Sequence, residues 1–260
     1  MTSDVTIAFM NIGIMEQAFA GKCARVHLKK IKTQVSQLFQ HHDVQIFCFV
    51  EVGQPRKGLS SESKVQFESA VQAGAADAER VVRFLRAEEN EAMVMAYVPE
   101  MNVTSGSLIK ELYHRQPWRN AMPFYLQGPT EQDRIQILLS HQPSSGLHTL
   151  SMNCRQEVLR ELIAHGLNLQ NWPYGAAEHS TTNSVPRCII GGDLNTTPTV
   201  LTLLAPNFTD EPIETATSKA DLSECKHGDI AIGSNMNFIH TDCMVQNRDP
   251  SRDIVLTVFP

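Results

Sequence analysis

The chain has 260 residues, of which 42% are hydrophobic and 19% are charged, and its formal net charge is -6. This size and composition are typical of a globular protein with a large core, so we expect a single domain over residues 1–260. The negative charge disfavours non-specific binding to duplex nucleic acid, because such binding depends on Lys and Arg side chains that neutralise phosphates.

We expect neither a secretory signal nor a membrane span in this sequence. Residues 1–14 do not combine a basic stretch with a long apolar run, and no run of about 18 apolar residues occurs. Cys48 and Cys188 lie inside apolar runs, where a free thiol behaves as a small hydrophobe, and there is no CxxC pair. We therefore expect an intracellular protein, cytoplasmic or nuclear, without a membrane span. We also expect a monomer.

The first part of the chain alternates between strand-like and helix-like segments. Residues 5–10 (VTIAFM) and 44–50 (VQIFCFV) are apolar runs that predict buried strands. Residues 22–40 place apolar side chains at close to helical spacing, and residues 65–92 are rich in Ala and Glu, so both segments are predicted to be helical. Residues 92–98 (AMVMAYV) predict a third strand.

The same alternation continues after a mixed stretch at 106–129. Residues 135–139 (IQILL) and 188–190 (CII) predict strands, and residues 154–165 between them predict a helix. Three closing strands are predicted at 229–232, 238–245 and 254–259. Several strands are continuous apolar runs, which is typical of an α/β fold whose sheets are covered on both faces.

Polar side chains follow four of the predicted strands directly. Asn11, Glu51, His141 and Asp193 each come after an apolar run. Because α/β folds place their chemistry where strands end at one edge of a sheet, these four residues are candidates for a functional site. A carboxylate such as Glu51 is costly to bury unless it is paired or bound to a metal.

The sharpest local motif is Gly191–Pro198 (GGDLNTTP). Asp193 and Asn195 are two residues apart, so on an extended segment their side chains point the same way. A carboxylate can then activate a water while the carboxamide holds it or a phosphoryl oxygen. The alternative is a surface turn in which both side chains cap backbone groups.

This motif resembles the GDxN motif of the endonuclease/exonuclease/phosphatase superfamily, which includes pancreatic deoxyribonuclease, apurinic endonucleases, deadenylases, neutral sphingomyelinases and inositol polyphosphate 5-phosphatases. Other segments resemble further motifs of the superfamily and follow in the same order. They are Phe9–Gly13 (FMNIG, the first-strand motif), Phe49–Val52 (FVEV, the second), Leu139–Ser144 (LSHQPS, the THL motif), Arg155–Leu162 (the helix after it) and His227–Ile232 (HGDIAI, the IDY segment).

The resemblance implies a four-layer α/β sandwich, in which two packed mixed β-sheets are flanked by helices, and hydrolysis of a phosphate ester with Mg²⁺ or Mn²⁺. Glu51 and Asn11 would bind the metal, and Asn195 and Asn11 would hold phosphoryl oxygens. Asp193 would deprotonate the attacking water. The remaining catalytic residues implied are His141, which would support the leaving group, and Asp229, which would support the site.

The sequence departs from the superfamily at its last motif. Where SDH is expected before the final strand, this chain has Ser251-Arg252-Asp253. Asp253 would place a negative charge where a His should contact the phosphate, whereas Arg252 could bind the phosphate as a bidentate donor. Another possibility is that His240 replaces the missing His. The departure supports an alternative function, in which an impaired member of the family binds nucleic acid or a protein.

Two questions stay open from the sequence. Four possible zinc ligands form a C-x-H…H-x-x-C pattern, namely Cys225, His227, His240 and Cys243, but His227 falls in the strand that resembles the IDY segment. The substrate class is also open, since the same catalytic set serves phosphodiesters and phosphomonoesters. A single-stranded nucleic acid is one candidate partner.

Overall fold

The structure is a computed structural model. The residues that it describes are 5–14, 19, 21–53, 58–87, 90–106, 121–127, 135–141, 188–193, 213–214, 229–234, 237–241 and 253–259. They form two helices and two six-stranded sheets.

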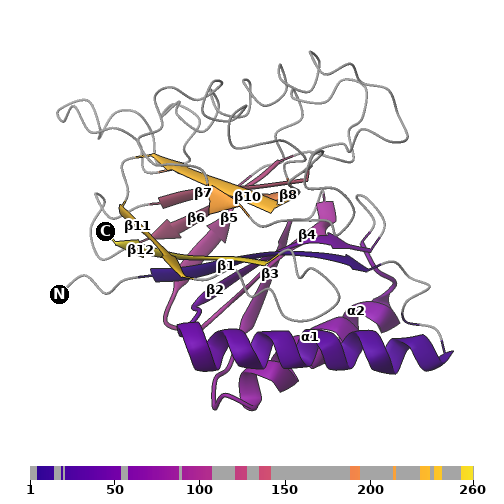
Figure 1. The fold of residues 1–260 in the computed structure, drawn as a ribbon. Helices are drawn as coiled ribbons and strands as arrows, with labels where there is room; N and C mark the ends of the chain where they lie inside the picture. Colours follow the sequence, from indigo (N-terminus) through magenta and orange to yellow (C-terminus); the bar gives the residue numbers. More distant parts are fainter. Residues whose placement is uncertain are drawn as a thin grey trace, which may run out of the picture.

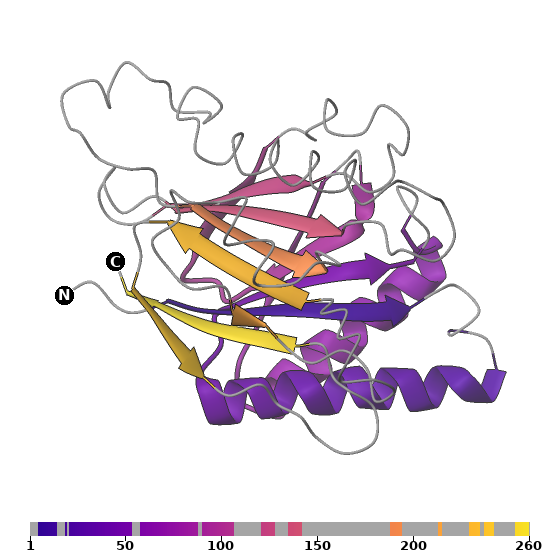
Figure 2. The same ribbon diagram turned by 45° about the horizontal axis from the view of Figure 1, so that its top comes forward.

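The first sheet joins the two ends of the described chain. Its strands lie in the order β11 (Asn237–Thr241), β12 (Asp253–Phe259), β1 (Val5–Ile14), β2 (Ile46–Val52), β4 (Asn90–Tyr97) and β3 (Arg83–Ala87). Only β1 and β2 are parallel, and all other neighbours are antiparallel. Figure 2 shows β12, in yellow, beside β1.

The second sheet repeats this plan. Its strands lie in the order β5 (Asn102–Ser105), β6 (Met122–Gln127), β7 (Ile135–His141), β8 (Cys188–Asp193), β10 (Asp229–Ser234) and β9 (Ile213–Glu214). Here β7 and β8 are the parallel pair, flanked by antiparallel neighbours. Each sheet is therefore mixed, with one parallel pair near its centre whose carboxyl ends lie at the same edge.

The two sheets pack face to face, and helices α1 (Gly21–His42) and α2 (Ser61–Ala76) cover the outer face of the first sheet (Figure 1). Alternate residues of the strands fill the space between the sheets, including Phe9, Cys48, Met95, Ile137 and Ile189. The other face of the first sheet packs on the helices through residues such as Phe47, Phe49, Val35 and Phe67. The prediction of an α/β sandwich with two packed mixed sheets is confirmed, and the helix predicted at 154–165 lies outside the described residues.

Two local features fix the helical layer. Ser60 caps the start of α2, since its side chain accepts a hydrogen bond from the Ser63 backbone N–H at 3.3 Å. Gly74 allows α2 to approach α1 closely, because a Cβ at this position would lie 2.5 Å from the Lys32 carbonyl oxygen. These two features fix the start of α2 and its close contact with α1.

The prediction of one helix over residues 65–92 was wrong. The helix ends at Ala76, and residues 83–87 form β3, an edge strand paired with β4. Glu79 adopts a positive φ of 58°, which an α-helix cannot contain, and it turns the chain back towards the sheet. Two further strands, β5 and β6, lie in or beside the stretch that was predicted only as mixed.

The predictions for Cys48 and Cys188 are confirmed, because both are free and fully buried. Burial raises the pKa of each thiol far above its ordinary value, because a thiolate would be desolvated there. Neither thiol is therefore poised for reaction. Among the described helices, none is long and apolar enough to cross a membrane.

Candidate active site

Three of the predicted site residues lie at one edge of the first sheet. Asn11 is near the end of β1 and pairs with Val50, so its neighbour across the parallel pair is the residue before Glu51. Asp253 begins β12 and pairs with Met10, one position from Asn11. The backbone thus brings Asn11, Glu51 and Asp253 to adjacent strand ends, although they are far apart in the sequence.

The second sheet presents three further predicted residues at adjacent positions. His141 ends β7 and pairs in register with Asp193, which ends β8. Asp193 in turn pairs with Asp229, the first residue of β10. The three residues therefore occupy one row across three neighbouring strands.

A side-chain contact joins the edges of the two sheets. His141 Nε2 lies 3.1 Å from Glu51 Oε1, with 15% of the His141 side chain and 25% of the Glu51 side chain exposed. His141 continues the alternation of Ile137 and Leu139, which face the first sheet from β7. The pair is close enough for the imidazole N–H to donate to the carboxylate.

Glu51 reaches this position only because the backbone breaks its alternation. Phe47 and Phe49 face the helices while Val50 faces the second sheet, so regular alternation would point Glu51 towards the helices. Instead Val52 packs on the helical side, and Glu51 meets His141. Glu51 has a positive φ of 58°, and the pairing with β1 shifts register at this point.

This left-handed conformation predicts a measurable strain at residue 51. An L-residue in this region costs roughly 1–2 kcal/mol, whereas glycine adopts it freely. We expect Glu51→Gly to have a free energy of unfolding about 1 kcal/mol higher than Glu51→Ala, although both lose the carboxylate. Chemical denaturation of the two variants measures the difference, and a value at or below zero would show that residue 51 is not held at positive φ.

The two glycines of the GGDLNTTP motif each have a structural reason. A Cβ at Gly191 would lie 2.4 Å from Cε1 of Phe9, so the ring of the first sheet presses directly on the backbone of β8. Gly192 has a φ of 116°, and a Cβ there would lie 2.2 Å from the carbonyl oxygen of Ser140. These contacts fix β8 against β1 and β7 one or two residues before Asp193.

Replacing Gly191 with Ala should therefore destabilise the protein and disturb the site. Overpacking of a tight core typically costs about 1–3 kcal/mol, and we expect Gly191→Ala to fall in this range. The same substitution in a Phe9→Leu background should cost less, because the smaller side chain leaves room for the new methyl group. Urea unfolding of the two single variants and the double variant gives the coupling free energy between residues 9 and 191. If the changes in the free energy of unfolding are strictly additive, Phe9 does not limit the size of residue 191.

Some predicted residues cannot be placed. Asn195 and Arg252 lie outside the described residues, as do Cys225, His227 and Cys243 of the zinc pattern. His240 lies in β11, the edge strand, and pairs with Leu256. It is thus three register positions along β12 from Asp253, or about 10 Å at roughly 3.3 Å per residue.

The donor set fits a hard divalent cation. Mg²⁺ prefers oxygen ligands, needs only one or two carboxylates from the protein and keeps several waters. The Glu51 carboxylate is partly exposed at the end of an otherwise buried strand, and Asn11 lies near the end of the neighbouring strand. Within the described part of the chain, no group of three or more His, Cys, Asp or Glu side chains forms a metal cluster by itself.

The sequence could not reveal the part played by Phe9. The paired glycines indicated a close approach of backbone, but they did not indicate which side chain approaches. The reversal of direction at Glu51 has no sequence signal either, since FVEV contains no glycine.

Comparison with known proteins places this geometry in a fold class. No family model and no curated protein matches the sequence. Solved structures do match, over nearly the whole chain. TDP2 from D. rerio complexed with single strand DNA product has a TM-score of 0.58 and 12% identity, covering 99% of this chain and 100% of that one.

Two other solved structures match to a similar extent. An endonuclease/exonuclease/phosphatase family protein from Bacteroides thetaiotaomicron has a TM-score of 0.55 and 10% identity, covering 99% of this chain and 95% of that one. The inositol polyphosphate 5-phosphatase domain of SPsynaptojanin, in complex with inositol (1,4)-bisphosphate and calcium ion, has a TM-score of 0.56 and 14% identity, covering 99% and 84%. The chain has the endonuclease/exonuclease/phosphatase fold.

Proposed function

We propose that this protein is a divalent-metal-dependent phosphoesterase that hydrolyses a phosphodiester with Mg²⁺ or Mn²⁺. The observation that carries the proposal is the contact between Glu51 and His141, which joins the two sheet edges where the other predicted residues end. A strained, left-handed residue at the end of a buried strand is typical of a functional site, because a purely structural role would favour glycine.

The charge of the site supports a cation. Four carboxylate-bearing residues lie at strand ends on the site edges of the two sheets, namely Glu51, Asp193, Asp229 and Asp253. Such a group would repel a phosphate ester unless a bound cation offsets it. When bound, a divalent cation supplies Lewis-acid stabilisation of the phosphoryl charge. Glu51 and Asn11 would hold it.

The chain's own residues would perform the remaining steps. Asp193 would accept a proton from the attacking water as general base. Asn195 and Asn11 would donate amide hydrogen bonds to phosphoryl oxygens, and His141 would donate its N–H to charge that develops on the leaving oxygen. Asp229, one strand from Asp193, would orient the catalytic residues, and Arg252 would add a phosphate contact.

A second candidate function is phosphate-ester binding with little or no catalysis. It is favoured by Asp253, which the register of β12 places beside Met10, one position from Asn11. A carboxylate there removes a donor that the site needs and adds a like charge. The two functions differ in turnover and not in ligand class.

The test is an assay of purified protein with and without Mg²⁺ or Mn²⁺ against a panel of substrates. The panel comprises single-stranded DNA, RNA, abasic duplex, a cyclic dinucleotide and inositol phosphates. We expect hydrolysis that EDTA abolishes and that His141→Gln lowers by about 10²–10³, the loss typical of one preorganised donor.

His42→Gln is the matched control, since it makes the same change at the end of α1, away from both strand edges. It should leave the rate unchanged. Metal-stabilised binding of a phosphate analogue without turnover would favour the binding function. If neither binding nor turnover depends on metal, both proposals are wrong.

The cellular location and oligomeric state stay predictions. Free, buried Cys48 and Cys188 support an intracellular, reducing compartment. Light scattering of the purified protein would test the expected monomer.

A further inference from the structure

The exposed side of α1 carries positive charge that the proposed active site does not use. The helix holds five Lys and Arg residues and no Asp or Glu, in a chain whose net charge is -6. In its first half, Arg25, His27 and Lys29 are exposed. Arg25 and Lys29 are four positions apart, so their side chains lie on one face of the helix. We refer to Arg25 and Lys29 as the α1 basic face.

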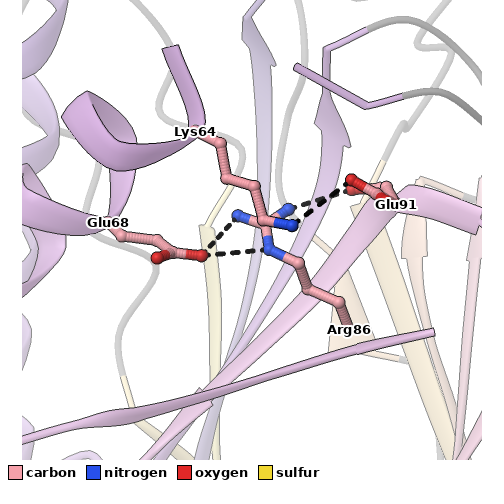
Figure 3. Close-up of polar contacts among 4 residues, drawn as sticks. All are labelled: Lys64, Glu68, Arg86 and Glu91. Atoms are coloured by element: carbon pink, nitrogen blue, oxygen red, sulfur yellow. Dashed lines mark hydrogen bonds and ion pairs between the residues drawn. The ribbon is translucent and has the colours of Figure 1, made fainter. Parts of the chain in front are cut away.

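Among the described residues, acidic side chains on and beside the helical layer pair with other cations. Asp77 pairs with Lys32 at 2.9 Å, one helical turn further along α1. Glu68 pairs with Arg86 at 3.0 Å and Glu91 with Lys64 at 3.4 Å, so these two acids are already offset (Figure 3). Arg25 and Lys29, by contrast, form no ion pair with any described residue.

The topology places the α1 basic face at the same end of the molecule as the candidate active site. β1 runs towards the edge that holds Asn11, and α1 then runs back beneath the first sheet (Figures 1 and 2). Phe19, between the two elements, is buried in the core between the first sheet and the helices. The first turns of α1 are therefore those nearest the site edge.

The apolar residues of α1 argue against a membrane surface as the partner. A helix that binds a membrane needs a free apolar face to insert below the head groups. In α1 the apolar face is already buried against the sheet, through Ile31, Val35, Leu38 and Phe39. Among the α1 residues whose exposure is described, Val26 is the one large apolar residue with high exposure. A polyanion that needs only charge contacts fits this surface better.

We propose that the α1 basic face binds the phosphate backbone of a single-stranded nucleic acid whose scissile phosphate lies at the site edge. This inference rests on the proposed phosphoesterase function and names its substrate class. A chain of phosphates can contact the active site and α1 at once, whereas an inositol phosphate or a nucleotide is too small to do so. Counterion release from each neutralised phosphate gives the binding energy.

The test uses Arg25→Glu and Lys29→Glu, with Arg83→Glu as the matched control. Arg83 is exposed on β3 of the same sheet. Its strand neighbour Tyr97 also pairs with Ile46, the first residue of β2, so Arg83 lies at the end of the sheet opposite the site. Fluorescence anisotropy of a labelled oligothymidylate, measured at several salt concentrations, reports affinity. Each α1 substitution should weaken binding about tenfold and reduce the slope of log K against log salt by about 0.7. The control should do neither.

A second readout separates this inference from the proposed function. Hydrolysis of bis(4-nitrophenyl) phosphate, which cannot reach α1, should be unchanged in both α1 variants. If wild-type protein does not bind the oligonucleotide, or if Arg83→Glu weakens binding equally, the inference is wrong while hydrolysis of the small ester is unaffected. The inference is also wrong if the α1 variants lose binding to phosphatidylserine vesicles but still bind the oligonucleotide as wild type does. That result would show that α1 binds a membrane surface. If no variant hydrolyses the small ester, the proposed function fails, and the binding data still decide the role of α1.

Discussion

Glu51→Gln should abolish the metal response of the protein while leaving its fold intact. The amide is nearly isosteric with the carboxylate and can still accept a hydrogen bond from His141, which lies 3.1 Å away. It lacks the negative charge that makes a carboxylate the stronger ligand for a hard cation. Loss of partners outside the coordination sphere already costs about 10–100-fold in metal affinity, so loss of a direct ligand should cost at least that. Calorimetric titration with Mg²⁺ and Mn²⁺ measures the affinity.

The matched control is Glu62→Gln, which removes the same charge from the exposed first turn of α2. It should bind metal as wild type does, so a loss confined to Glu51→Gln cannot arise from net charge. The rate of hydrolysis should fall by at least about 10²–10³ in Glu51→Gln. An unchanged isotherm in this variant would remove Glu51 from the metal site.

Asp253→His should increase metal-dependent hydrolysis. Asp253 begins β12 opposite Met10, so a His at this position would lie beside the strand end that carries Asn11. The substitution replaces a like charge with a donor that Asp229 could orient. One preorganised donor is typically worth about 10²–10³ in rate, and we expect a gain of at least tenfold. Steady-state hydrolysis under saturating Mg²⁺ is the measurement.

Two further variants separate the causes of such a gain. Asp253→Ala removes the charge without adding a donor, so the difference between Ala and His at this position isolates the donor. His240→Ala tests the other candidate His, and the register of β11 against β12 predicts no effect, because His240 pairs with Leu256 and not with the site end. If wild-type protein is already fast and Asp253→His is no faster, the idea of a missing donor is wrong.

The strands at the centre of each sheet could be predicted because both of their faces are buried. β2, β7 and β8 are short, nearly continuous apolar runs, and runs of this length and composition are typical of strands that are covered on both sides. Their polar ends then located the candidate site residues, since parallel strands end at one edge. The fold class was predicted from the motifs that resemble the superfamily and from their order along the chain.

The edge strands and the left-handed residue could not be predicted, because they depend on partners distant in the sequence. β3 follows an Ala-rich helix and has helix-compatible residues, and its pairing with β4 decides its conformation. β6 contains Pro123, which argues against an interior strand, yet it lies between β5 and β7. The direction of Glu51 depends on Val50 and Val52 packing on opposite faces, which only the assembled core determines.

The position of β12 has a consequence for how the protein is made. β1 is synthesised first among the strands, yet one of its two neighbours is β12, which follows every other described element along the chain. A nascent chain therefore carries β1 with an unpaired backbone edge throughout most of translation, and such edges invite association with other strands. Contacts this distant in sequence also form slowly. Because Met10 pairs with Asp253, the strand that completes the pairing of β1 is also the one that brings Asp253 to the edge of the candidate site, so this edge is assembled late in folding.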